Sequence, residues 1–234
     1  MQSSKVQYTE MKEMHLVNRI NWLRAAVLGA NDGILSISSI ISGMVAGGAD
    51  HKNILLAGVA AIIAGATSMA TGEYVSVSSQ ADTETADLKR EKLELANYPD
   101  EELEELAQIY VSRGVEVSLA RDVAKQLMKR DALAAHARDE LGISEVVSVN
   151  PMQAALASAA SFIAGAILPL AVTIISPQDL ALFSVGISSL ASLAILGALS
   201  AYAGGVAILK PMMRISLWGV FSLILAAMVG TLFR

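Results

Sequence analysis

Long stretches almost without charged side chains are the feature that most constrains this chain. Hydrophobic residues make up 54% of the sequence and charged residues only 17%, and the charges are concentrated outside these stretches. Because a helix that crosses a bilayer needs about 20 mostly apolar residues, the pattern predicts an all-α integral membrane protein. The charges inside the stretches are Asp32 in 25–49, Glu73 in 53–81, Asp179 in 151–209 and none in 216–233.

Five segments are long enough to span the membrane, and a charged insert separates the second from the third. The second span could continue as a single helix into this insert. The predicted spans are 24–47, 53–79, 152–175, 179–204 and 213–233. The predicted domains are an N-terminal segment at 1–23, spans one and two within 24–81, an acidic helical metal-binding domain at 82–150 and spans three to five within 151–234.

Basic residues near the span ends predict the orientation. They gather before the first span, throughout the insert and in the turn before the last span, which all fall on one side of a five-span protein. Only Lys52 and Arg234 fall on the other side. Since cytoplasmic loops are enriched in Lys and Arg, the N-terminus and the insert are predicted to be cytoplasmic. The residues before the first span are polar, so we expect no cleaved signal peptide.

Local signals predict three helical segments in the insert. One continues the second span through Leu95, and one begins at Pro99, a favoured first-turn residue, and ends near Gly114. The third is predicted as one helix from about residue 116 to Leu141, with apolar residues at helical spacing along one face. Glycines recur in the spans at intervals of four and seven residues, which lets helix backbones approach closely.

Several classes of chemistry are disfavoured. With no cysteine, the chain has no disulfides, thiolate metal sites or cysteine nucleophiles. No predicted span contains His, so a Ser–His intramembrane protease would lack its base, and no Gly-rich nucleotide-binding loop supports a primary pump. The net charge of −5 comes from the insert and does not indicate nucleic acid. We predict that the chain is not an enzyme and has no prosthetic group and no nucleic-acid partner.

Asp32 is the most informative residue of the spans. It lies about 12 Å along the first span from Arg24, within the hydrocarbon. A carboxylate at this depth must be paired, hydrated or protonated. A group that holds either a proton or a metal ion is what a metal/proton antiporter requires. The alternative is that Asp32 caps a broken helix, as the neighbouring Asn31 and Gly33 suggest.

Two residues of the second span are further candidates for a transport pathway. Met69 falls at a depth comparable with that of Asp32, and its thioether is a soft ligand compatible with iron(II) or copper. Its alternative role is ordinary packing. Glu73 lies one turn nearer the cytoplasmic end, where it could relay ions to the span or lie in the headgroup region without a role.

The insert contains acidic pairs at helical spacing. Residues three or four apart share a helix face, and two carboxylates so placed can chelate one cation or form a solvated face beside basic neighbours. His15 and His51 have no such pattern and are treated as surface residues. The predicted metal ligands are Glu91 with Glu94, Glu102 with Glu105, and His136 with Glu140.

Together these features resemble the vacuolar iron transporter (VIT) family over essentially the whole chain. The Asp-Gly step in the first span and the acidic insert are the most specific parts of the likeness. The segments that carry it are Asn31-Asp32-Gly33, residues 68–76 (SMATGEYVS), Leu88-Lys89-Arg90-Glu91, Ile109-Tyr110-x-x-Arg113-Gly114 and Asp139-Glu140-Leu141-Gly142.

The resemblance implies a homodimer that exchanges cytoplasmic iron(II), or manganese and other divalent ions, for protons. It implies that Asp32 and Met69 are the metal ligands within the membrane and that the insert glutamates form a cytoplasmic metal-binding domain. The sequence departs from the family pattern at Ala61, where plant members have a glutamate that Glu73 would replace. It departs again at His136 and Ala137, where a Met and a Glu are expected. The site then has one fewer carboxylate and gains an imidazole, which favours zinc or cobalt alongside iron.

The sequence therefore predicts a homodimeric divalent-metal/proton antiporter that exports iron(II), or manganese, cobalt or zinc, from the cytoplasm. The first alternative is a membrane-anchored metal sensor or storage module, and the second is a small membrane enzyme that uses carboxylates for acid–base chemistry. In the absence of a recognisable targeting signal, a bacterial cytoplasmic membrane is the favoured location, with a vacuolar membrane as the alternative.

Overall fold

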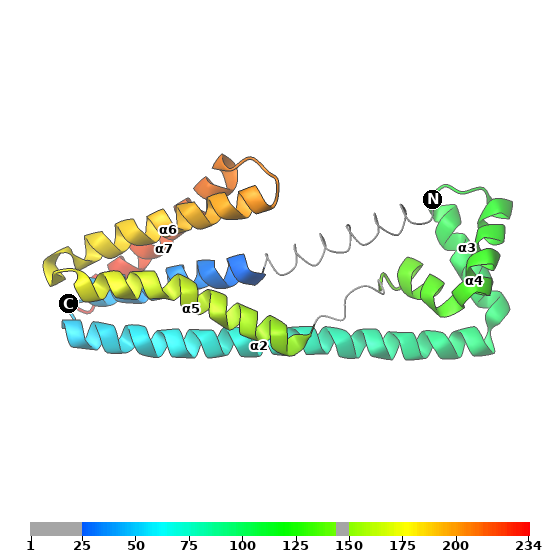
Figure 1. Ribbon diagram of the computed structural model, residues 1–234, viewed down its shortest axis with the longest axis horizontal. Helices are drawn as coiled ribbons and strands as arrows, with labels where there is room; N and C mark the ends of the chain where they lie inside the picture. Colours follow the sequence, from blue (N-terminus) through cyan, green and yellow to red (C-terminus); the bar gives the residue numbers. More distant parts are fainter. Residues whose placement is uncertain (1–24, 144–149) are drawn as a thin grey trace, which may run out of the picture. The chain divides into compact units, whose positions relative to one another are not determined.

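The computed structural model describes residues 25–143 and 150–234 (Figure 1). The predicted N-terminal segment at 1–23 lies outside these described residues. The described chain separates into two compact units. The membrane unit comprises the described residues up to Val75 together with Pro151–Arg234, and the insert unit comprises the described part of Ser76–Asn150.

The five predicted spans are confirmed. Within the described ranges, five helices are long and apolar enough to cross a membrane, and the same ranges contain no strands. The protein is therefore an all-helical membrane protein. The spans are Ala25–Ala46, α2 (His51–Asn97), α5 (Pro151–Ile175), Gln178–Ala203, which joins the short 3-10 turn η1 (Gln178–Leu180) to α6 (Ala181–Ala203), and α7 (Leu209–Thr231).

Helix α2 is much longer than a bilayer requires. Its 47 residues extend about 70 Å at 1.5 Å per residue, whereas the hydrocarbon core is about 30 Å thick. Only its first part, residues 53–79, is nearly free of charge, and the charged residues follow from Asp82 onward. The expected continuation of the second span into the insert as one helix is thus observed, and the residues after Val75 belong to the insert unit.

Small residues let the spans of the membrane unit pack backbone against backbone. A side chain at Gly33 of the first span would collide with the carbonyl oxygen of Phe162 in α5. A side chain at Gly230 of α7 would collide with the carbonyl oxygen of Gly43. Because lipid tails are as apolar as the helices, such close packing is a main source of helix association in a bilayer. Gly72 differs, since nothing lies near it.

The core of the membrane unit forms around Phe162. Its ring is buried and lies against Gly65 of α2, where any larger residue would occupy the same space. Ile37 and Ile41 of the first span and Ile54 of α2 are buried in the same cluster. The first span therefore shares one buried core with α2 and α5 of this unit.

Helix α3 (Pro99–Ser112) begins as its sequence predicts. Proline occupies the first turn, where its missing N–H costs nothing, and three acidic residues, Asp100, Glu101 and Glu102, suit the positive end of the helix dipole. The turn that follows uses Gly114, whose φ of 93° lies in the region that favours glycine.

Helix α4 (Val117–Asp139) contains a break that the predicted single helix did not include. Its start is capped by Glu116, whose carboxylate accepts two backbone N–H groups of the first turn. At Asp131 the backbone is extended, with φ −162° and ψ 100°, and the Asp131 carboxylate accepts the N–H of Ala134 at 3.0 Å. Asp131 therefore ends one helical segment and N-caps the next. The prediction of one unbroken helix is wrong here.

Both segments of α4 pack against α3. Ala124 before the break and Ala135 after it are buried in one cluster with Leu106 and Ala107 of α3. Tyr110, further along α3, packs against this cluster. The break at Asp131 thus allows the second segment, which carries His136, to reach the α3 side of the insert unit.

Candidate metal centre

Four metal-ligating side chains from three helices converge in the insert unit. Glu91 comes from α2, Glu102 from the first turn of α3 and His136 from the last turns of α4, and Glu140 is the C-cap residue of α4. One ligand atom of each lies within 4.8 Å of the others. Among the described residues, this is the one group of three or more His, Cys, Asp or Glu side chains close enough to hold a single ion.

The imidazole of His136 lies among the three carboxylates. Its Nδ1 lies 2.8 Å from Oε2 of Glu140, 3.0 Å from Oε1 of Glu91 and 3.7 Å from Oε2 of Glu102. A ring N–H can serve one of these acceptors at a time, and the geometry of a hydrogen bond is met toward Glu140. Oε1 of Glu91 and Nε2 of His136 are buried without a hydrogen-bond partner in the described chain.

Burial makes this arrangement costly unless a cation or protons are present. His136 is fully buried, Glu91 is 2% exposed and Glu102 is 7% exposed. Buried polar atoms are normally hydrogen-bonded, and buried carboxylates are normally paired or bound to metal. A divalent cation among the four side chains would satisfy the unpartnered oxygen and would neutralise the carboxylates.

The pKa values of the buried glutamates are consistent with this free-energy cost of burying carboxylates. Burial raises the pKa of Glu91 to about 7, repulsion from Glu140 acts in the same direction, and His136 opposes them. Burial also raises the pKa of Glu102, assisted by repulsion from Glu105. Both glutamates belong to the insert unit and lie outside the apolar part of α2. The raised pKa values favour protonation of Glu91 and Glu102 in the absence of metal, and an arriving metal ion would displace such protons.

An acidic cavity of about 430 Å³ adjoins the cluster. Two of the predicted ligands, Glu94 and Glu105, line its wall, where Glu94 is half-buried and Glu105 is exposed. Asp87 and Glu101 also line the cavity, and neither was predicted as a site residue. Asp87 lies one helical turn before Glu91, so the spacing of four residues was the available signal.

The donor set suits a divalent ion of borderline character. Carboxylate oxygens bind magnesium, calcium and manganese well, whereas imidazole suits zinc, copper, iron and nickel. A site of three carboxylates and one imidazole therefore suits iron(II) and the neighbouring transition metals better than it suits magnesium. The four residues form this candidate site at the wall of the acidic cavity.

Asp32 lies in an unbroken helix of the membrane unit. The first span is helical throughout Ala25–Ala46, so the alternative in which Asp32 caps a broken helix is wrong. Asp32 is half-buried, and the hydroxyl of Ser36 donates a 2.8 Å hydrogen bond to its carboxylate. The adjacent Asn31 has a buried side-chain oxygen without a hydrogen-bond partner in the described chain. Asn31 was not predicted as a ligand, although it is a second oxygen donor beside Asp32.

The two predicted site residues of α2 lie in the same unit. Met69 is half-buried and packs against the core cluster around Phe162, which agrees with a packing role and leaves a ligand role as a prediction. Glu73 is half-buried at the last turn of α2 that belongs to the membrane unit. Since one carboxylate and one thioether do not make a closed metal site by themselves, the membrane site stays a prediction.

Comparison with known proteins places this arrangement in a family. The VIT family model matches residues 23–231, which include all five spans and the insert. The chain belongs to the VIT family. A protein of Acanthamoeba castellanii named vacuolar iron transporter is 43% identical over 222 residues, covering 94% of this chain and 82% of that protein.

Plant members of the VIT family are also similar. Vacuolar iron transporter homolog 2.1 of Arabidopsis thaliana is 32% identical over 214 residues, covering 90% of this chain and 80% of that protein. Vacuolar iron transporter homolog 2 of Oryza sativa subsp. japonica is 33% identical over 216 residues, covering 92% of each. The likeness thus extends over the membrane unit and the insert unit alike.

Proposed function

We propose that this VIT-family protein exchanges a divalent metal ion, with iron(II) as the foremost candidate, for protons and moves the metal out of the cytoplasm. The observation that carries the proposal is the cluster of Glu91, Glu102, His136 and Glu140, of which the first three are buried, in a chain with five membrane-spanning helices. The names of the relatives, vacuolar iron transporter and vacuolar iron transporter homolog 2.1, support iron as the substrate.

In this mechanism the insert collects metal ions and the membrane unit moves them. The acidic cavity and the cluster raise the local concentration of cytoplasmic metal. Asp32 and Met69 then bind the ion within the membrane, with the side-chain oxygen of Asn31 as a further donor. Protonation of Asp32 from the far side weakens its hold on the metal and releases it. Glu73 relays ions between the insert and the span.

The assembly and the location of the protein are also part of the proposal. We propose a homodimer, as the resemblance to the family implies. We also propose that the N-terminus and the insert are cytoplasmic, which the distribution of basic residues supports. The cytoplasmic metal-binding domain is proposed for residues 82–150. The names of the relatives favour a vacuolar membrane over the bacterial cytoplasmic membrane that the sequence alone favoured.

A membrane-anchored sensor or storage module is the second candidate. The cluster lies wholly within the insert unit, so it could bind metal without any step in the spans. Asp32 and the backbone-to-backbone packing at Gly33 weigh against this candidate, because an anchor needs neither a charged residue in the hydrocarbon nor tightly fitted helices.

The two candidates separate in one experiment on purified protein in proteoliposomes. Iron(II) uptake is measured with and without an imposed proton gradient for the wild type and for Asp32→Asn, and iron(II) binding is measured on the same preparations. The proposal expects gradient-dependent uptake in the wild type, no uptake in Asp32→Asn and equal binding by both. Binding without uptake by the wild type would favour the sensor or storage module.

A further inference from the structure

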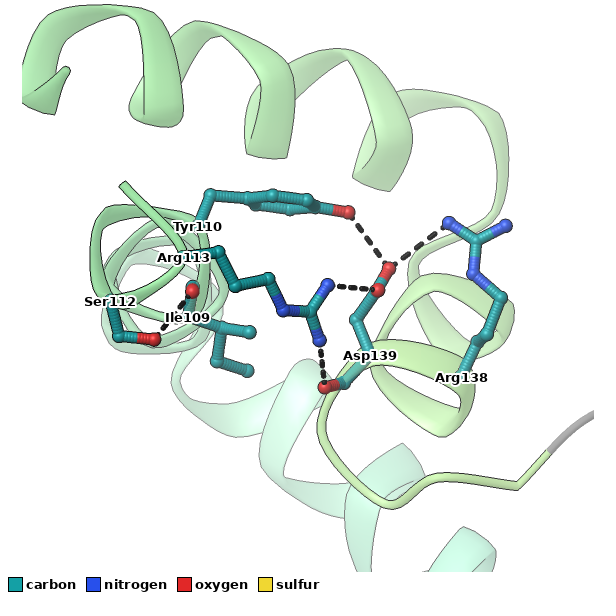
Figure 2. A network of polar contacts seen from close by, with 6 residues as sticks. All are labelled: Ile109, Tyr110, Ser112, Arg113, Arg138 and Asp139. Atoms are coloured by element: carbon teal, nitrogen blue, oxygen red, sulfur yellow. Dashed lines mark hydrogen bonds and ion pairs between the residues drawn. The ribbon is translucent and has the colours of Figure 1, made fainter. Parts of the chain in front are cut away.

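A network of polar contacts joins the end of α3 to the end of α4 (Figure 2). At its centre is Asp139, whose side chain is 9% exposed. Arg113 donates to the Asp139 carboxylate at 2.7 Å and, through its second guanidinium nitrogen, to the Asp139 backbone carbonyl at 2.9 Å. The hydroxyl of Tyr110 donates to the same carboxylate at 2.8 Å, and Arg138 donates to it at 3.0 Å.

The network is strong enough to fix the chain where it forms. The guanidinium of Arg113 lies over the ring of Tyr110, with 5.5 Å from its central carbon to the ring centre, so the two donors also hold each other. Three side chains, those of Arg113, Tyr110 and Arg138, donate to the one Asp139 carboxylate, and hydrogen bonds from guanidinium groups to a carboxylate are among the strong ones.

Asp139 directly precedes one metal ligand and follows another by three residues. Successive helical residues point about 100° apart, so a side chain at 139 that is fixed on α3 determines where the side chain at 140 points. The backbone N–H of Glu140 donates to the carbonyl of His136 at 2.9 Å, which links the two ligands through the last turn. The last turn of a helix frays easily unless its end is held.

The contacts of Glu140 within the cluster do not tie the last turn of α4 to another helix. Glu140 is the most exposed of the four, with 25% of its side chain accessible, and its hydrogen bond is to His136 of the same helix. Glu91 and Glu140 are both carboxylates, so they cannot hold each other across the site without a proton or a cation between them. An anchor outside the cluster is needed to keep Glu140 facing the cavity.

We infer that Asp139 is a positioning residue of the metal site, which Tyr110 and Arg113 hold so that Glu140 and His136 face Glu91 and Glu102. The inference rests on metal binding at the cluster of the proposed function. It assigns these three residues a role in metal affinity, although none of them is placed among the ligands.

The test measures cobalt(II) affinity and the visible absorption spectrum of bound cobalt(II) on the full-length protein in detergent. Tyr110→Phe removes one hydrogen bond and keeps the ring, and Arg113→Lys keeps the charge but loses the paired donors. Since changes in residues that orient metal ligands cost about 10–100-fold in affinity, each variant is expected to bind cobalt(II) about tenfold more weakly, with an altered spectrum. Arg113→Ala should bind cobalt(II) more weakly than Arg113→Lys does.

Glu116→Ala is the matched control. It removes the cap at the opposite end of α4, so it lowers the unfolding temperature without touching the last turn. Its cobalt(II) affinity and spectrum should equal those of the wild type. Wild-type affinity and spectrum in Tyr110→Phe and Arg113→Lys would overturn the inference and leave the metal site intact. If the wild type bound no cobalt(II), the proposed site itself would fail.

Discussion

Replacing Glu91 by glutamine should stabilise the metal-free insert and weaken its metal site. Burial raises the pKa of Glu91 from an ordinary 4.5 to about 7, so the folded protein keeps a proton here that the unfolded chain loses. Because the pKa of Glu91 is higher in the folded state, its protonation contributes fully to the free energy of unfolding below pH 4.5. This contribution decreases as the pH rises toward 7. Each unit of difference in pKa corresponds to about 1.4 kcal/mol. At pH 8 the raised pKa of Glu91 therefore lowers the free energy of unfolding by about 3 kcal/mol.

Glu91→Gln keeps the shape of the side chain and removes this cost. The metal-free variant should therefore unfold at a higher temperature than the wild type at pH 8, and at the same temperature at pH 4.5. Thermal unfolding followed by circular dichroism at both pH values measures the difference, and titration with zinc measures the loss of affinity. The same displaced proton means that wild-type zinc affinity should fall as the pH drops below about 7.

Glu94→Gln is the matched control for this prediction. Glu94 lines the same cavity but is only half-buried, so its replacement changes the net charge of the cavity equally without relieving a buried carboxylate. It should give no gain in stability that depends on pH. The reasoning would be refuted if Glu91→Gln lowered the stability of the metal-free protein at pH 8, or changed it by the same amount at both pH values.

Two further predictions concern the metal preference and the helix packing. In His136→Gln, zinc affinity should fall about tenfold more than manganese affinity, because imidazole suits zinc and carboxylates suit manganese. Competition titrations measure both affinities, and an equal fall would contradict the role of His136. Gly33→Ala should lose about 1–3 kcal/mol in thermal unfolding, because its new methyl group collides with the carbonyl of Phe162, whereas Gly72→Ala, in open space, should not destabilise; equal effects would contradict this packing.

The membrane spans could be predicted from the sequence because the solvent itself imposes the pattern. Lipid excludes charge over a fixed thickness, so a stretch such as 216–233 has few alternatives to a spanning helix. Four of the helices lie within a few residues of the predicted bounds, and the second starts near its predicted beginning but continues as α2 to Asn97. The close approach at Gly33 was also foreseeable from small residues at helical spacing, although which helix it meets was not.

The break in α4 shows where local signals become ambiguous. Asp131 is a favoured N-cap residue, and Ala134 lies at the position whose N–H such a cap accepts. The same aspartate would be equally acceptable on the exposed face of an unbroken helix, and the apolar spacing on either side supports helix throughout. Packing of Ala124 and Ala135 on α3 decides between the two, and no local pattern contains that contact.

The candidate site was predicted as residues but not as an arrangement. Spacing within one helix pairs Glu91 with Glu94 and Glu102 with Glu105, and only the pair of His136 with Glu140 meets as spacing predicts, at 2.8 Å. In the structure, Glu91 and Glu102 instead converge across helices. Helical periodicity fixes which residues share a face, whereas the partner of that face depends on tertiary packing and on the break at Asp131.

Exchange of metal for protons through Asp32 can be tested by measuring both fluxes in the same proteoliposomes. A metal-sensitive dye and a pH-sensitive dye are enclosed together, and iron(II) is added outside. We expect iron(II) entry to be accompanied by proton exit at a fixed ratio, and both fluxes to vanish in Asp32→Asn. Iron(II) entry without proton movement, or unchanged fluxes in Asp32→Asn, would contradict this exchange.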